Sequence, residues 1–144
     1  MIEQDTIRLL KECDAGVDMG VAAIEDCLSY VKDKDFKNLL EKSKDDHIIF
    51  KKELDGLLNK YKDDGKDLHP LIKGMSKMKT NMKLSMDSSD SMVASVMTDG
   101  CDMGVKSLSK YLNEYKAADE KSKDLTKRII ENEEKLALDI RKYL

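Results

Sequence analysis

The sequence predicts a single all-α domain over residues 1–144, an antiparallel four-helix bundle, and three observations lead to this fold class. The chain has 144 residues, which is the length of one domain with its own core. Charged residues make up 38% of it and hydrophobic residues 40%, with seven glycines and one proline, a composition typical of amphipathic helices. Apolar residues recur at alternating spacings of three and four, as one face of a helix requires.

The first two helices are predicted over residues 3–32 and 35–62. The apolar face of the first contains one carboxylate and consists of Ile7, Leu10, Asp14, Val17, Val21, Ile24, Leu28 and Val31. The apolar face of the second contains one histidine and consists of Phe36, Leu39, Leu40, Ser43, His47, Phe50, Leu54, Leu57 and Tyr61. Asp35 is the predicted N-cap of the second helix. Because so few residues join the two helices, we expect them to pack antiparallel as a hairpin.

Residues 62–70 are predicted to form a loop, because they contain a glycine, the only proline and five charged residues. A short crossover helix is predicted over residues 71–86, and its apolar stripe consists of Leu71, Met75, Met78, Met82 and Met86. Methionines at helical spacing favour a cover for the core, and a groove for a partner or a copper(I) site are the alternatives.

The last two helices are predicted over residues 89–115 and 118–144. The segment DSSDS at residues 87–91 offers N-caps for the third helix, and Lys116 to Asp119 turn the chain into the fourth. The apolar face of the fourth helix consists of Leu125, Ile129, Leu136, Ile140 and Leu144.

An internal repeat relates the two hairpins. The segment DMGV at residues 18–21 returns at residues 102–105, an offset of 84, and the apolar stripe that surrounds it repeats with it. The two hairpins are therefore expected to be copies related by a pseudo-twofold axis. The connection between them, within residues 62–90, is expected to run the length of the bundle, about 40 Å for 27 helical residues.

Four segments carry a resemblance to a known family: MGVAAIEDCL at 19–28, VKDKDFKNLLEKSKDDHIIFKKELDGLL at 31–58, MSKMKTNMKLSMDSS at 75–89 and MTDGCDMGVKSLSKYLNEYKAADEKS at 97–122. Over nearly its full length the chain resembles the ferritin-like superfamily, and within it a bacterial branch of domains of unknown function common in Firmicutes. The resemblance implies an antiparallel four-helix bundle with a crossover and no established activity.

The di-iron site of ferritin-like proteins needs a glutamate or a Glu-x-x-His motif from each helix, all pointing into the bundle. His47 is retained in the second helix, but other residues replace the anionic ligands: Ala22, Lys44, Lys106 and Ile130. Each replacement removes a hard anionic ligand, and a lysine repels a cation. We therefore expect no cofactor, with iron, manganese or zinc as the metals that a degenerate site could hold.

His47 and Glu133 are expected in one central layer of the bundle, from the levels at which antiparallel helices face each other. A buried carboxylate is costly unless it is paired, and an imidazolium is a suitable partner. We expect a contact between the two side chains, direct or through water, that fixes the register of the helices. A remnant metal site at His47 and Glu133 is one alternative, and an outward Glu133 with Asn132 on the stripe is another.

Further polar and small residues surround this layer. Asp14 and Thr98 are expected to hydrogen-bond between the first and third helices. Asp18 and Asp102 flank the apolar stripe and fit solvated or interface positions better than ligand positions. Two Gly-x-x-x-Gly faces are expected to let the first and third helices approach closely or to seat another subunit, and they comprise Gly16, Gly20, Gly100 and Gly104.

Several function classes are excluded or disfavoured by composition. The net charge is −3, and the basic run from Lys73 to Lys83 lacks interleaved aromatics, so nucleic-acid binding is not expected. Apolar runs are too short for a membrane span, and charges near the start interrupt a signal peptide, so we expect a cytoplasmic protein. The three cysteines are expected to be buried reduced thiols, with a reactive thiol as the alternative: Cys13, Cys27 and Cys101.

No signature of nucleophilic catalysis or of phosphate or dinucleotide binding is present in the sequence. The sequence therefore favours a non-enzymatic structural or interaction module, either a homo-oligomer or a binder of another protein. The alternative is a metal-binding ferritin relative with a degenerate site at His47 and Glu133.

Overall fold

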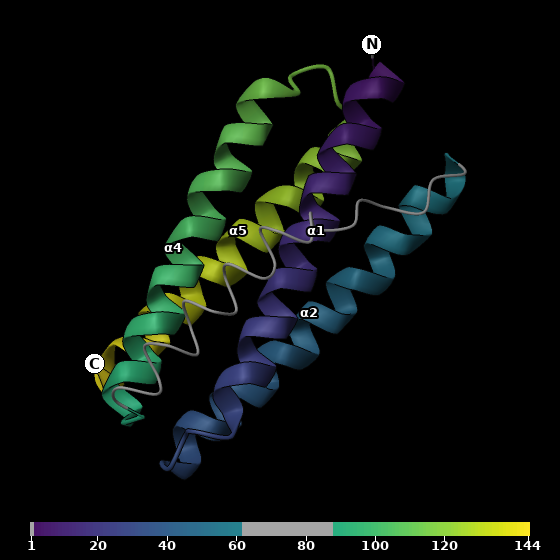
Figure 1. The fold of residues 1–144 in the computed structure, drawn as a ribbon. Coiled ribbons are helices and arrows are strands. Elements are labelled where there is room, and N and C mark those ends of the chain that lie inside the picture. The colour runs from purple at the N-terminus through teal and green to yellow at the C-terminus, as the bar shows by residue number, and fades with distance from the viewer. Residues whose placement is uncertain (1, 62–87) are drawn as a thin grey trace.

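The computed structural model describes residues 2–61 and 88–144, and these ranges contain four long helices and no strand. The helices are α1 (Ile2–Leu28), α2 (Lys34–Lys60), α4 (Asp90–Glu114) and α5 (Glu120–Ile140), followed by the short 3-10 helix η1 (Arg141–Tyr143) (Figure 1). The predicted all-α class with four long helices is confirmed. The first and fourth helices end four residues earlier than predicted, and the predicted loop at 62–70 and helix at 71–86 lie outside the described residues.

Three of the helices begin at a side chain that caps the first turn. The carboxylate of Asp33 accepts a hydrogen bond from the Phe36 N–H at 2.9 Å, so the prediction of Asp35 as the N-cap of α2 is wrong. The physical reason is reach, because the cap must bond an N–H two or three residues on, and Asp35 already lies inside the first turn. Ser89 caps α4 and Asp119 caps α5 in the same way.

The two hairpins, α1 with α2 and α4 with α5, are tied to each other at both ends of the bundle. At one end the Asp5 carboxylate accepts the Ala117 N–H at 3.1 Å. At the other end the Asp90 carboxylate accepts the N–H groups of Lys32 and Asp33 at 2.8 and 2.9 Å. The start of α1 therefore lies beside the end of α4, and the start of α4 lies beside the end of α1. The two helices are antiparallel.

Helices α1 and α5 run in the same direction. The Asp119 N–H donates to the Thr6 hydroxyl at 2.8 Å, and the Cys13 and Thr126 side chains meet at 3.2 Å. The Tyr61 hydroxyl donates to the Asp119 carboxylate at 3.4 Å, so α2 ends where α5 begins. The end of α2 and the start of α4 thus lie at opposite ends of the bundle (Figure 1).

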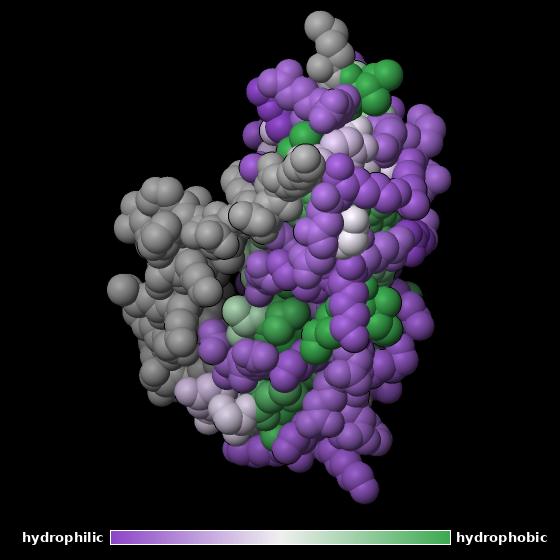
Figure 2. Space-filling view, turned by 90° about the vertical axis from the view of Figure 1, so that its right-hand side faces the viewer, coloured by the Kyte–Doolittle hydropathy of each residue, from purple (hydrophilic) through white to green (hydrophobic). Residues whose placement is uncertain are grey.

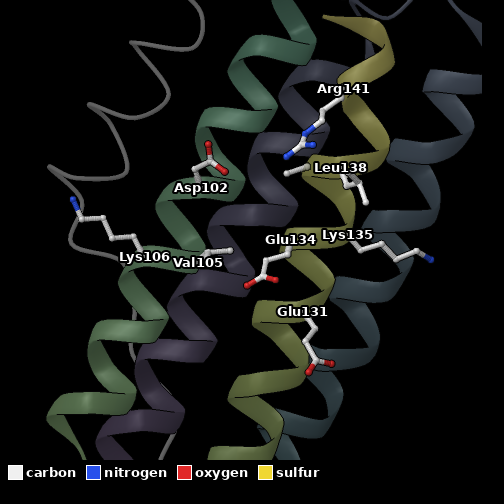
Figure 3. A pocket seen from close by; sticks show the side chains of 9 residues that line it. Asp102, Val105, Lys106, Glu131, Glu134, Lys135, Leu138 and Arg141 are labelled. Atoms are coloured by element: carbon white, nitrogen blue, oxygen red, sulfur yellow. The ribbon is translucent and has the colours of Figure 1, made fainter.

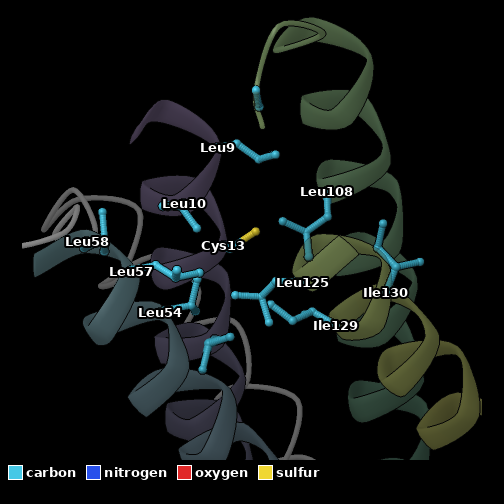
Figure 4. Close-up of a cluster of buried hydrophobic side chains, with 12 residues drawn as sticks. Leu9, Leu10, Cys13, Leu54, Leu57, Leu58, Leu108, Leu125, Ile129 and Ile130 are labelled. Atoms are coloured by element: carbon cyan, nitrogen blue, oxygen red, sulfur yellow. The ribbon is translucent and has the colours of Figure 1, made fainter. Parts of the chain in front are cut away.

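The apolar interior is divided into two clusters along the bundle. One lies near the start of α1 and includes Leu9, Leu10, Leu54 and Leu125 (Figure 4). The other lies near the end of α1 and includes Ile24, Phe36, Leu40, Met97 and Ile140. On each helix the two clusters are separated by a short interval, and these intervals contain residue 20 of α1, 47 of α2, 104 of α4 and 133 of α5. The interior therefore has one level between the clusters where the chain places something other than large apolar side chains.

The surface is mainly hydrophilic on the face that Figure 2 shows, with small apolar patches. The large apolar side chains exposed in the described ranges are Ile2, Ile48, Ile49, Met103, Leu138 and Leu144. Single exposed apolar residues are normal for a folded domain. None of the helices at 2–61 and 88–144 combines the length and the apolar content that crossing a membrane requires.

Candidate functional site

His47 and Glu133 meet in the central level between the two apolar clusters. The His47 side chain on α2 is 2% exposed and the Glu133 side chain on α5 is 14% exposed. The His47 Nε2 atom lies 2.7 Å from Oε1 of Glu133. The predicted contact is confirmed as a direct one, and Glu133 does not turn outward. It joins the two hairpins across the middle of the bundle.

Both ring nitrogens of His47 face acceptors. Nδ1 lies 2.7 Å from the Ser43 carbonyl oxygen, one turn earlier on α2. A carbonyl oxygen only accepts, so Nδ1 carries a proton and donates it, and an ionised carboxylate likewise requires a proton on Nε2. Burial by itself lowers the pKa of His47, but the hydrogen bond and the charge of Glu133 outweigh it and raise the pKa above its ordinary value. The contacts of both ring nitrogens and the raised pKa favour the imidazolium form of His47 beside Glu133.

A glycine makes room for each member of the pair. A Cβ atom at Gly20 would lie 2.6 Å from Nε2 of His47, far inside van der Waals contact, so only glycine fits there. A Cβ atom at Gly104 would lie 4.0 Å from the Glu133 side chain, an ordinary contact. The two glycines of the repeated DMGV segment thus face the ion pair from α1 and α4.

Two of the four glycines in the Gly-x-x-x-Gly faces do not lie against the other of the first and third helices, and the seating of another subunit on these faces stays a prediction. The atoms nearest to a Cβ at Gly20 belong to His47 of α2, and those nearest to one at Gly104 belong to α5. At Gly16 and Gly100 no described atom lies within 4 Å of the position that a Cβ would take. Gly20 and Gly104 each accommodate a polar side chain of the other helix in the same hairpin, whereas Gly16 and Gly100 are exposed and contact no residue of the described ranges in this way.

A second polar cluster lies one helical turn away, between α1 and α2. The Asp14 side chain is buried, and the Lys51 Nζ atom reaches it at 2.6 Å. Lys51 also lies 3.3 Å from Asp18 and 3.7 Å from Asp55. Burial raises the pKa of Asp14 more than Lys51 lowers it, and for Lys51 the carboxylates outweigh burial, so its pKa is raised too. Lys51 is thus an ammonium ion that compensates a buried carboxylate.

The predicted hydrogen bond between Asp14 and Thr98 is wrong. The Thr98 hydroxyl donates to carbonyl oxygens of its own helix, those of Ala94 at 2.9 Å and Ser95 at 3.1 Å. A threonine inside a helix commonly bonds the preceding turn in this way. Lys51 takes its place, because a lysine stem is long enough to bring the charge to a buried partner from the edge of the interface. Its position four residues after His47 was the available sequence signal.

The cysteines are buried and free. Burial and the charge of Glu133 raise the pKa of Cys101, while burial raises the pKa of Cys13 and of Cys27 to about 12. A thiol with a raised pKa stays protonated at neutral pH and is a poor nucleophile or metal ligand. The structure therefore favours inert thiols over a reactive one.

A metal ion would compete with this arrangement for the same side chains. A histidine ligates through a lone pair, and His47 has none while both nitrogens donate. The residues at 2–61 and 88–144 include no group of three or more histidine, cysteine or acidic side chains placed to hold a metal. Lys44, three residues before His47, lies 3.3 Å from Glu25 at the surface, so it faces away from the interior level. In this arrangement His47 and Glu133, the two candidate ligands, are engaged with each other.

A groove of about 630 Å³ lies outside this interior, between α4 and α5 (Figure 3). Its charged lining residues are Asp102, Lys106, Glu131, Glu134, Lys135 and Arg141. Asp102 is exposed, and Asp18 is partly exposed beside Lys51, as expected for residues that flank the apolar stripe. Six of its nine lining residues carry a charge, whereas small-molecule sites are lined predominantly by hydrophobic and aromatic side chains.

The chain matches no protein-family model, and neither a curated protein nor a solved structure shows a significant match to it. Four long helices in the described ranges are established, and the resemblance to the ferritin-like superfamily stays a prediction. The chemistry of the interior follows from its own side chains. It holds two groups of paired opposite charges, His47 with Glu133 between the hairpins and Lys51 with Asp14 between α1 and α2.

Proposed function

We propose that this protein is a ferritin-like bundle in which an ion pair replaces the metal centre, and that it acts as a non-enzymatic structural or interaction module. The observation that carries the proposal is the contact of His47 with Glu133 at 2.7 Å, in the level between the two apolar clusters. In some proteins a buried polar pair fixes the register of the elements that it joins, and we assign that role to this pair.

The ferritin-like arrangement is supported by contacts that recur in the two hairpins. Asp5 accepts the N–H of Ala117, and Asp90, 85 residues after Asp5, accepts the N–H of Lys32, 85 residues before Ala117. Each hairpin thus holds the turn of the other with an aspartate from the start of its own first helix. Together with helix directions that require a connection between opposite ends of the bundle, this supports a pseudo-twofold relation of the hairpins.

A non-enzymatic role is supported by the protonation of the interior groups. The imidazolium of His47 holds no lone pair to accept a proton, and the ammonium of Lys51 holds none to attack a carbon. Cys101 is a neutral thiol beside a carboxylate. The three free, buried thiols of the protein also fit a reducing compartment, so we include a cytoplasmic location in the proposal.

Metal content after loading tests the proposal. The purified chain is incubated in turn with iron(II), manganese(II) and zinc(II), desalted, and analysed by mass spectrometry of its metals. We expect far less than one ion per chain, and the same content in a His47→Ala variant. Stoichiometric metal that is lost in His47→Ala would refute the proposal and establish the alternative, a degenerate metal site at His47 and Glu133.

A gain-of-ligand variant serves as the positive control of the same measurement. Gly104→Asp adds a carboxylate on α4 at the level of His47 and Glu133, because a Cβ at Gly104 would lie 4.0 Å from the Glu133 side chain. If metal content rises in Gly104→Asp and stays low in the unaltered chain, the assay detects binding at this level. The low value is then a property of the native side chains.

A further inference from the structure

The groove between α4 and α5 carries exposed charges of both signs that are not neutralised within it. Asp102 and Lys106 lie on α4, and Glu131 and Lys135 lie on α5 (Figure 3). All four are exposed. In the described part of the chain, none of the four lies within 4.0 Å of a side chain of opposite charge.

The order of these charges is the same on both helices. On each helix the acid precedes the base by four residues, and the midpoints of the two acid–base pairs are Gly104 on α4 and Glu133 on α5. A Cβ at Gly104 would lie 4.0 Å from the Glu133 side chain, so the two midpoints lie at one level of the bundle. Because the helices are antiparallel, the acid of α4 and the acid of α5 lie on opposite sides of that level.

We propose that two copies of this chain associate face to face through the groove, about a twofold axis that passes at the level of Gly104 and Glu133. Such an axis reverses the direction of each helix and lays it against the same helix of the second copy. Asp102 then meets Lys106 of the second copy, and Glu131 meets Lys135 of the second copy. Each contact occurs twice, and none of these four charges meets one of its own sign. Glu134, which also lines the groove, lies one residue from the level of the axis and faces Glu134 of the second copy, so this one like-charge contact opposes the four ion pairs.

Apolar surface is available at the same interface. Leu138 lines the groove and is 56% exposed, and Val105 lines it from α4. Protein interfaces combine an apolar centre with a polar rim. Here Leu138 and Val105 would supply apolar surface, and the self-complementary charges would surround it. Exposed ion pairs contribute little each, so we expect a dissociation constant of about 0.1 to 1 mM at low salt. The inference goes beyond the proposed function and does not depend on it, because metal binding at His47 would leave these surface charges unchanged.

Sedimentation equilibrium of the full chain tests the proposal at ionic strengths of about 0.01 M and about 1 M, where charges are screened beyond about 30 Å and about 3 Å. We expect dimers at low salt and a dissociation constant at least about tenfold larger at high salt. Lys106→Glu places an acid opposite Asp102 of the second copy and is expected to weaken the dimer at least about tenfold. Lys110→Glu, the same change on the next turn of α4 and outside the groove lining, is the matched control.

A charge exchange separates this geometry from a general effect of net charge. The double variant Asp102→Lys with Lys106→Asp still brings opposite charges together under the twofold axis, so it is expected to dimerise like the unaltered chain. Circular dichroism verifies that each variant is folded. A chain that stays monomeric at about 1 mM and low salt, a dimer that Lys106→Glu leaves intact, or an exchange variant that fails to dimerise would each overturn the proposal.

Discussion

Replacing Gly20 by alanine is expected to destabilise the bundle, although alanine is the better helix former. Gly20 lies within α1, where alanine would normally add about 1 kcal/mol of stability. The added Cβ would lie 2.6 Å from Nε2 and 2.7 Å from Cδ2 of His47. Ordinary contact begins at 3.4 Å, so the ring and the backbone must separate by about 0.8 Å.

The cost of this displacement follows from the bonds that hold the ring. The imidazolium is fixed by the Ser43 carbonyl at 2.7 Å and by the Glu133 carboxylate at 2.7 Å, and a shift of about 0.8 Å breaks at least one of these bonds. Overpacking costs about 1 to 3 kcal/mol, and a lost hydrogen bond to a charged group about 1.5 to 3 kcal/mol. After the gain of about 1 kcal/mol in helix propensity, the net loss is about 1.5 to 5 kcal/mol.

Urea unfolding monitored by circular dichroism measures this loss, and the chain supplies two matched controls. A Cβ at Gly16 meets no described atom within 4 Å, and one at Gly104 makes only ordinary contact at 4.0 Å. Gly16→Ala and Gly104→Ala are therefore expected to be neutral or to stabilise the protein by up to about 1 kcal/mol. In a His47→Ala background the ring is absent, so Gly20→Ala is expected to become harmless there.

The reasoning would be refuted if Gly20→Ala were as stable as the unaltered chain, or if its effect were unchanged in the His47→Ala background. Either result would mean that the imidazole is not held against Gly20. The expected coupling between the two substitutions is at least about 1 kcal/mol, well above the error of a denaturant titration.

Three further outcomes are expected in the same unfolding assay. The pKa of His47 is raised above 6.5 in the folded protein, so protonated His47 stabilises the fold fully below about pH 6.5, and this contribution is lost as the pH rises through the folded-state pKa. Across that range the unaltered chain is therefore expected to lose stability relative to His47→Gln. Parallel curves of stability against pH would contradict this. Lys51→Met leaves Asp14 buried and unpaired and costs about 1 to 3 kcal/mol, which adding Asp14→Asn should largely restore. Asp90→Ala removes the acceptor of two backbone N–H groups and costs about 1 to 2 kcal/mol, against almost nothing for the exposed Asp45→Ala.

Burying the ion pair of His47 and Glu133 costs desolvation free energy, and its location between the two apolar clusters indicates what it contributes in return. Apolar side chains on either side of it could pack in several registers, because one leucine replaces another with little penalty. A charged pair at 2.7 Å tolerates no such shift, since a slip would leave a charge buried without a partner. We therefore infer that the pair aligns the helices at a level that lies between two apolar clusters.

The sequence by itself determined the four long helices and their apolar faces, because a helix turns by a fixed angle per residue and the spacing of apolar positions reveals the buried stripe. It also predicted that His47 and Glu133 share a level, since helical rise and antiparallel pairing convert residue numbers into heights. The sequence did not determine the start of α2, because Asp33 and Asp35 are equally good caps by residue type.

Only the tertiary structure decided which polar side chains meet. Lys51, not Thr98, is the partner of Asp14, because the length of a lysine stem and the packing of two helices fix a contact that no periodicity encodes. The glycines of α1 differ in their surroundings for the same reason. Gly16 and Gly20 lie one turn apart on the same helix, yet only Gly20 faces an imidazole. Height along a helix follows from sequence position, whereas the distance between two helices depends on all of the side chains packed between them.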